Sequence, residues 1–336
     1  MTSNVALMRA LTRSSSAQPL RAPGASPSIM SSKPAKSTDK LAIGIDLGGT
    51  NVRAALVTCE GDIVAQEQRP TPAIEGRYAS PAALVQAMAD CAAPLFGQAD
   101  ILGVGVGSGG QFDPRSGILL SVHTGDPAFI NVPIAAMLRE QLGAPVFIDN
   151  DVKAAALAEL QLGAGRGYQH LICVAVGTFI GGALVMDGRI VHGAQGLAGH
   201  LGQLLDYETG TYIENIAGGV ALAQHAFASG LLERGQTTVD LFAKADSGHD
   251  DAARFIADAG RKLGVALAGL AHALQPEVIL VGGSVGLQAR YIDAINAGLQ
   301  AHLMPNWQSI RAVPMQLGTD AGKIGAALRV YDELAP

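Results

Sequence analysis

The segment IGIDLGGTNVRAALV, residues 43–57, holds the pattern that decides the fold. An apolar run ends at Asp46 and Leu47, the turn Gly48-Gly49-Thr50-Asn51 follows, and a second apolar run begins. This pattern predicts two antiparallel strands joined by a glycine turn. Because glycine has no Cβ, consecutive backbone N–H groups can point toward one anion, and Thr50 adds a hydroxyl donor. The turn is therefore a candidate phosphate site, and Asp46 is placed to hold Mg²⁺ through water.

A second Gly-Thr turn, Gly177-Thr178, lies inside the least polar stretch of the chain, residues 171–186. That stretch is too short for a membrane span of about 18–20 residues, and its central glycines predict a hairpin instead. Two further glycine clusters follow strand-like runs, at 103–110 and at Gly282-Gly283-Ser284. One such cluster alone is more typical of an ordinary turn. Two Gly-Thr turns, one in each half of the chain, favour a site that grips a triphosphate from both sides.

Helical and strand-like segments alternate along each half of the chain. In the first half we expect strands at 41–47, 52–57, 63–66, 101–106 and 144–148, and helices at 82–96, 133–142 and 151–162. In the second half we expect strands at 171–176, 181–186, 189–192 and 278–281, and helices around 213–227, 253–274, 291–303 and 321–330. Hairpin strands followed by helices and further strands thus occur twice. This order predicts a duplicated α/β fold with two domains and a cleft between them.

Other nucleotide-binding and hydrolase patterns are missing from the sequence. Gly105-x-Gly107-x-x-Gly110 formally matches a dinucleotide fingerprint. The residues after it, 111–115, predict a turn rather than the helix N-terminus on which a pyrophosphate would sit. The chain contains no G-x-x-x-x-G-K-[ST] or H-E-x-x-H pattern, and no Cys/His cluster with zinc spacing.

A candidate general base lies in Asp149-Asn150-Asp151, between a predicted strand and the helix 151–162. Asn or Asp at such a place often caps a helix by accepting from its free N–H groups. The same place is also the carboxyl end of a strand at the mouth of the expected cleft. There Asp151 could accept a proton from a substrate hydroxyl while Asn150 binds a neighbouring hydroxyl.

The composition excludes several classes of protein. The 336 residues carry 23 Lys and Arg against 29 Asp and Glu, a net charge of −6, which argues against a nucleic-acid or anionic-membrane partner. Apolar residues make up 49% of the chain, which excludes a mainly disordered protein. The cysteines Cys59, Cys91 and Cys173 are far apart, so we expect no disulfide framework and a cytoplasmic location.

Residues 1–40 differ in composition from the rest of the chain. Ser, Thr, Ala and Pro dominate, and every charge before Asp39 is basic. This composition predicts a disordered extension, although it is also compatible with an organellar transit peptide.

Five segments, in order, resemble the motifs of the ROK family of sugar kinases and related repressors, within the actin-like ATPase superfamily. They are IGIDLGGTNVRAALV (43–57), IDNDVKAAALAE (148–159), VAVGTFIGGALVMDGRIVHGAQGLAGHLGQ (174–203), PEVILVGGSVG (276–286) and LGTDAGKIGAAL (317–328). The resemblance covers roughly residues 41–331. It implies a duplicated, ribonuclease H-like α/β fold. The smaller domain would be residues 41–150 plus 322–336, the larger 151–321, and the protein a homodimer.

The resemblance also implies roles for single residues. Asp151 would be the general base on a sugar hydroxyl, and Asp46 would help to place Mg²⁺. The implied ATP-binding residues are Asp46, Gly48, Gly49, Thr50, Asn51, Gly177, Thr178, Gly282 and Gly283. The implied sugar-binding residues are Gly110, Asn150, His200, Gln203 and Glu214.

The sequence departs from the family pattern around the sugar and metal residues. His200 stands where the family has a sugar-binding Glu, and Gln203 stands where it has a zinc-binding His. The family's zinc cysteines are missing, so we expect no zinc. Phe179 replaces a glycine of the second phosphate motif, where it would either shield the cleft from water or obstruct ATP.

Two functions follow from this resemblance. The first is an ATP-dependent, glucokinase-like kinase for a hydroxyl of a hexose or hexose derivative. The second is a non-catalytic, sugar-sensing protein without a DNA-binding domain.

Overall fold

The computed structural model describes residues 40–74, 77–122 and 125–335. The first of its two large sheets has the strand order β3-β2-β1-β6-β9. Strand β1 pairs antiparallel with β2 and parallel with β6, and β9 continues the parallel part. The strands are β1 (Leu41–Leu47), β2 (Asn51–Val57), β3 (Ile63–Pro70), β6 (Ile101–Ser108) and β9 (Val146–Asn150).

The second large sheet repeats this arrangement, with the order β12-β11-β10-β13-β14. Strand β10 pairs antiparallel with β11 and parallel with β13, as β1 does with β2 and β6. The strands are β10 (Leu171–Val176), β11 (Ile180–Met186), β12 (Arg189–Ile190), β13 (Val278–Gly282) and β14 (Ala312–Pro314). The duplication and the hairpin predicted within 171–186 are therefore confirmed.

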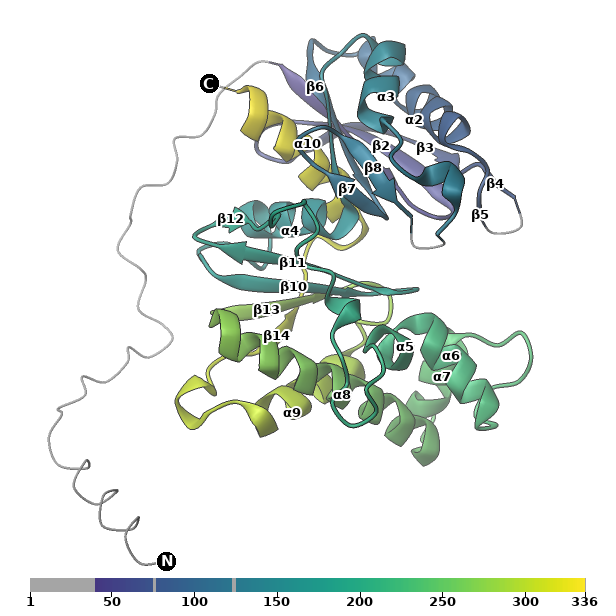
Figure 1. Cartoon of the computed structure of the whole chain (residues 1–336), viewed down its shortest axis with the longest axis vertical. Helices are drawn as coiled ribbons and strands as arrows, with labels where there is room; N and C mark the ends of the chain where they lie inside the picture. The colour runs from purple at the N-terminus through teal and green to yellow at the C-terminus, as the bar shows by residue number, and fades with distance from the viewer. Residues whose placement is uncertain (1–39, 75–76, 123–124, 336) are drawn as a thin grey trace, which may run out of the picture. The chain divides into compact units, whose positions relative to one another are not determined.

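Helices cover both faces of the first sheet. The side chains of Ile43 and Ile45 form a buried cluster with helices α2 (Pro81–Phe96) and α3 (Ile134–Leu142). On the other face lie α10 (Ala321–Leu334) and α4 (Asp151–Leu162) (Figure 1). Alternation along β1 turns Ala42, Gly44 and Asp46 toward this second face.

Glycines let helix α10 lie unusually close to its neighbours. A Cβ on Gly44 would lie 1.8 Å from the Lys323 carbonyl oxygen, and one on Gly105 would lie 1.8 Å from the Ala326 oxygen. A Cβ on Gly325 would lie 1.7 Å from the Ala154 oxygen of α4. Any side chain at these positions would push the backbones apart. The N-terminus of α10 is thereby held beside Asp46, whose Oδ1 would be 3.2 Å from a Cβ on Gly322.

A buried carboxylate fixes the segment that leads into α10. Glu159 of α4 accepts the backbone N–H groups of Gln316 and Leu317 at 2.8 and 2.7 Å. It also accepts the N–H of Ala164 at 2.8 Å. Three donors satisfy this buried carboxylate and tie α4 to the approach of α10.

The second sheet has α4 on one face and a group of helices on the other. This group consists of α5 (Glu214–Ala217), α6 (Gly219–Ala228), α7 (Thr238–Asp246), α8 (Asp250–Leu274) and α9 (Ala289–His302) (Figure 1). Short elements complete the described chain: β4 (Ala73–Ile74), β5 (Arg77–Tyr78), β7 (Gln111–Asp113), β8 (Ile118–Ser121), η1 (Pro127–Phe129), η2 (Leu201–Gln203), η3 (Pro305–Trp307) and η4 (Gly318–Asp320).

The remaining sequence predictions have different outcomes. Residues 111–113, where we expected a turn, form strand β7. No helix follows Gly110, which supports our rejection of the dinucleotide fingerprint. None of the helices in the described residues is long and apolar enough to cross a membrane. The predicted extension lies outside the described residues except for Lys40. The domain boundaries at 150/151 and 321/322 stay a prediction, since the described residues fall within a single compact unit.

Candidate active site

Three aspartates gather at the carboxyl ends of the parallel strands in the first sheet. In the strand register, Asp46 of β1 and Asp149 of β9 both pair with Gly107 of β6. A Cβ on Gly107 would lie 3.6 Å from the Cα of Asp151, the first residue of α4. The glycine lets α4 begin directly against the sheet, which brings Asp151 to the same edge as Asp46.

Burial and mutual repulsion act on two of these carboxyl groups. Burial, and then the negative charge of Asp151, raise the pKa of Asp46 to about 6. The charges of Arg53, 3.8 Å away, and of Lys323 oppose this rise in pKa. Burial also raises the pKa of Asp151, although hydrogen bonds from its surroundings oppose it. The negative charge of one carboxylate makes ionisation of the other less favourable. A site with two such carboxyl groups suits a proton acceptor or a bound cation.

The carboxyl ¹³C resonance of Asp46 is expected to titrate near pH 6 in the ligand-free protein. Its midpoint should fall in Asp151→Asn, which removes a neighbouring negative charge, and on addition of Mg²⁺, which favours the ionised form. Because the folded-state pKa is raised, Asp46 contributes stability below pH 3.8 that is lost as the pH rises through about 6. Asp46→Asn assigns the resonance. A midpoint near 3.8 in the wild type would contradict the described environment.

Asn150 caps helix α4, as its position suggested. Its Oδ1 accepts the N–H groups of Val152 at 3.0 Å and Lys153 at 3.4 Å, and its Nδ2 donates to the Gly110 oxygen at 3.3 Å. Asp151 Oδ1 also accepts from the N–H of Val152, at 2.9 Å. Its other oxygen, Oδ2, would be 3.9 Å from a Cβ on Gly109, so a glycine keeps the space beside it open.

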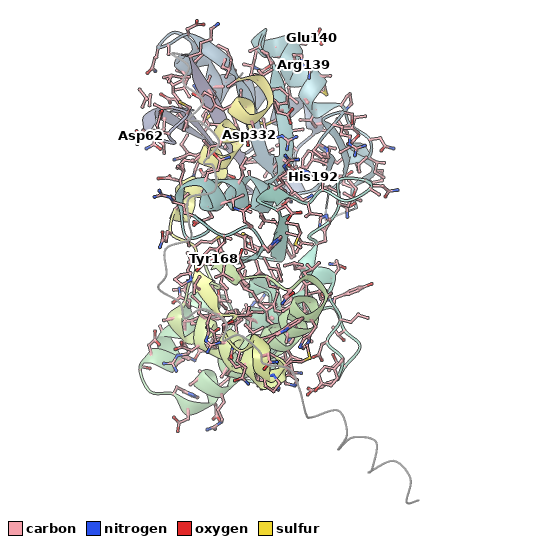
Figure 2. The ribbon with its side chains drawn as sticks, turned by 90° about the vertical axis from the view of Figure 1, so that its left-hand side faces the viewer. Asp62, Arg139, Glu140, Tyr168, His192 and Asp332 are labelled. Atoms are coloured by element: carbon pink, nitrogen blue, oxygen red, sulfur yellow. The ribbon has the colours of Figure 1, made fainter. Side chains whose placement is uncertain are left out.

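An ion-pair network that the sequence did not reveal lies beside the candidate base. Asp149 Oδ2 is 2.6 Å from His192 Nε2 and 2.9 Å from Arg329 Nη1, on α10 (Figure 2 labels His192). Burial alone would raise the pKa of Asp149. The hydrogen bond from His192 and the charge of Arg329 outweigh burial and hold this pKa below its usual value. The network anchors the end of β9 immediately before Asn150 and Asp151.

The same segment is joined to the loop after β12 at a second point, where Lys153 Nζ of α4 donates to the Gly196 oxygen. Burial lowers the pKa of Lys153, while Asp149 opposes this shift. The sequence analysis singled out Asp149 only as part of Asp149-Asn150-Asp151, without any partner for it. Its partners are 43 and 180 positions away, so no local pattern could have found them.

The first Gly-Thr turn is closed by its own backbone and braced by one buried hydroxyl. Gly48 N–H donates to the Asn51 oxygen at 3.0 Å, and Thr71 Oγ1 donates to the Gly48 oxygen at 2.7 Å. Gly49 and Thr50 are exposed, and no atom lies within 4 Å of a Cβ built on Gly49. This part of the turn has the open space that a phosphate group needs.

The second Gly-Thr turn rests on the beginning of α6. The carbonyl oxygens of Gly177 and Thr178 accept the N–H groups of Gly219 at 2.9 Å and Val220 at 3.1 Å. No atom lies within 4 Å of a Cβ built on Gly177. The Phe179 side chain is 44% exposed, so this replacement of the family's glycine lies outside the hydrophobic core.

Gly282 and Gly283 lie where β13 ends beside β10. Gly283 has a φ of +84°, and a Cβ on it would lie 2.3 Å from the Val176 oxygen. That oxygen accepts the N–H groups of Val285 and Gly286, both at 3.0 Å. A glycine is required for this close turn.

Gln203 and Glu214 are a second pair of candidate sugar residues that the fold brings together, besides Asn150 and Gly110. Glu214 is buried, and its Oε1 accepts from Gln203 Nε2 at 3.4 Å while its Oε2 accepts the N–H of Ile180 at 3.0 Å. His200 immediately precedes the short helix η2, which ends at Gln203. The described residues contain no group of three or more His, Cys, Asp or Glu side chains placed to hold a metal ion.

Two sheets of matching order, with glycine turns and an aspartate pair at their strand ends, define the actin-like ATPase fold. The model of the ROK family matches residues 42–333, and the chain belongs to that family.

Several relatives of the chain are sugar kinases. It is similar to a glucokinase of Halalkalibacterium halodurans, with 28% identity over 88% of this chain and 96% of the relative. It is 31% identical to an N-acetylmannosamine kinase of Shigella boydii, over 87% of this chain and 98% of the relative. It also matches the structure of a ROK family glucokinase from Streptomyces griseus in complex with glucose and AMPPNP. That match has a TM-score of 0.73 and 28% identity, and it covers 85% of this chain and 98% of the other.

Proposed function

We propose that this protein is an ATP-dependent sugar kinase that phosphorylates a hydroxyl group of a hexose or hexose derivative. The observation that carries the proposal is the placement of Asp151. It begins α4 at the strand edge, shares its surroundings with Asp46, and has one oxygen beside the open space at Gly109. The sugar-kinase relatives and the sugar and nucleotide in the Streptomyces griseus structure support it.

In the proposed reaction, Asp151 Oδ2 accepts the proton of the sugar hydroxyl. The hydroxyl oxygen forms a bond to the γ-phosphorus, and the bond from that phosphorus to the bridging oxygen breaks, so that ADP leaves with the electron pair. The raised pKa of Asp151 suits a proton acceptor better than an ordinary exposed aspartate would.

The residues present fit a nucleotide with Mg²⁺, on two observations. Open space lies next to Gly49 and Gly177, where phosphate oxygens would meet backbone N–H groups. The raised pKa of Asp46 shows that its ionised form is unfavourable there, and a bound cation would stabilise that form. When bound, Mg²⁺ would neutralise charge on the phosphates. We assign the phosphates to Gly48, Gly49, Thr50, Asn51, Gly177 and Thr178, the adenosine side to Gly282 and Gly283, and Mg²⁺ to Asp46 through water.

We assign the sugar to Gly110, Asn150, His200, Gln203 and Glu214. The hydrogen bonds of Asn150 and Glu214 to the backbone hold both side chains in fixed orientations, which is what recognition of a hydroxyl pattern needs. The proposal includes two domains, 41–150 with 322–336 and 151–321, and a homodimer.

The test is ADP release with Mg-ATP across glucose, mannose, fructose, N-acetylglucosamine, N-acetylmannosamine and allose. We expect ADP release that depends on at least one of these sugars. If all six sugars leave ADP release at its sugar-free rate while calorimetry still detects sugar binding, the protein is a non-catalytic sugar sensor. Without sugar binding, both functions are contradicted.

A further inference from the structure

Tyr78 is a partly buried tyrosine that no sequence pattern singled out. It ends the short hairpin of β4 and β5, where it pairs with Ala73, two residues before the Ser80 cap of α2. Its ring lies 6.0 Å, centroid to centroid, from the ring of the buried Phe129, at an interplanar angle of 51°. The strand pairing and the ring contact fix the direction of the side chain.

The ring packs against the core cluster between the first sheet and α2, and some residues beside it belong to the strand edge that carries the candidate base. Tyr78 lines an apolar cavity of about 10 Å³ together with Leu47, Ser108 and Gly109. Gly109 is the residue beside Asp151 Oδ2. The volume of the cavity is at the lower limit for a single water molecule. The Tyr78 ring is therefore packed closely against the residues that line it.

The electrostatics agree with this location. Burial, and then the negative charges of Asp151 and Asp46, raise the pKa of the Tyr78 hydroxyl. The hydroxyl therefore stays protonated at neutral pH and can donate a hydrogen bond.

The hydroxyl of Tyr78 also differs from those of the well-packed tyrosines. Tyr291 donates to the Ala217 oxygen at 2.7 Å, and Tyr331 donates to the Val57 oxygen at 2.8 Å. No hydrogen bond joins the Tyr78 hydroxyl to another described residue. Among the buried side-chain nitrogen and oxygen atoms of the described chain, only Arg329 Nε lacks a partner, so the Tyr78 hydroxyl is not among the buried atoms.

We propose that Tyr78 contacts the sugar, with its fixed ring as one wall of the acceptor site and its hydroxyl donating to a polar group next to the hydroxyl that is phosphorylated. This proposal rests on the proposed sugar-kinase function and adds one specificity residue to it. The nucleotide phosphates, assigned to the glycine turns, do not need Tyr78.

The test is Tyr78→Phe, which removes the hydroxyl and keeps the ring. One neutral hydrogen bond contributes about 0.5–1.5 kcal/mol, so we expect KM for the best sugar to rise about 2- to 12-fold. KM for ATP should not change. Calorimetry without ATP should show the same factor in the Kd for the sugar. The matched control is Tyr168→Phe, a partly exposed tyrosine labelled in Figure 2, which should leave both constants unchanged.

The outcomes separate this proposal from the function on which it rests. An active wild type with an unchanged KM and Kd for the sugar in Tyr78→Phe overturns the role of Tyr78 alone. An equal rise in KM for ATP also overturns it, because a general disturbance of the site would then explain the effect. A wild type that neither binds nor phosphorylates any sugar overturns both.

Discussion

Asp151→Asn is expected to lower kcat for sugar phosphorylation by about 10²- to 10⁴-fold, the usual contribution of a general base. Asparagine keeps the oxygen that accepts the N–H of Val152, so the start of α4 should be preserved. It cannot take up the proton of the attacking hydroxyl. The measurement is coupled ADP release with the best sugar of the panel, together with calorimetry of sugar and ATP binding. Binding should change far less than kcat.

The matched control for this substitution is Asp62→Asn, which removes the same charge from an exposed turn (Figure 2). We expect wild-type kcat in that variant. The role of Asp151 as base is contradicted if Asp151→Asn retains more than about a tenth of the wild-type kcat. If the sugar affinity of Asp151→Asn falls by the same factor as its kcat, Asp151 has a positioning role instead.

Asp149→Asn is expected to cost about 3–5 kcal/mol of unfolding free energy, because it leaves the mostly buried Arg329 beside a neutral group. The measurement is urea unfolding of both proteins at neutral pH. Because the folded-state pKa of Asp149 is lowered, its contribution is present above the unfolded value of 3.8 and is lost as the pH falls through the folded value. The difference between wild type and variant should therefore shrink in acid.

Glu333→Gln is the control, because Glu333 is the more exposed partner of the same arginine. Exposed ion pairs contribute about 0–1 kcal/mol, so this variant should unfold nearly as the wild type does. Equal, small losses in the two variants would show that the network around Asp149 contributes little to stability.

The sequence predicted the fold well wherever local patterns decide the structure. The apolar runs and the turns at Gly48 and Gly177 predicted both hairpins, and the helix expected at 82–96 lies within α2. Boundaries were less accurate: β3 continues to Pro70, where we expected it to end at Gln66. The helix expected around 213–227 is divided at Gly218 into α5 and α6.

The candidate site was predicted only in part, for a physical reason. Asp46 and Asp151 lie at strand ends, which apolar runs mark in the sequence. The partners His192 and Arg329 of Asp149 become its neighbours only when the loop after β12 and helix α10 meet at the end of β9. Tyr78 belongs to a hairpin of two-residue strands, too short for any periodicity to predict. Contacts of this kind depend on tertiary packing, and no local pattern in the sequence predicts them.

The glycine contacts of α10 have a consequence for the order of events during synthesis. The face of the first sheet that receives α10 is made of residues from β1, β2 and β6, whereas α10 follows every strand of the second sheet. At 5–20 residues per second, the ribosome needs roughly 10–30 s between β9 and α10. Throughout that interval the nascent first sheet lacks one of the two helices that cover this face. Chaperones that bind exposed apolar strands have this interval in which to act, and truncation before Ala321 would make the exposure permanent.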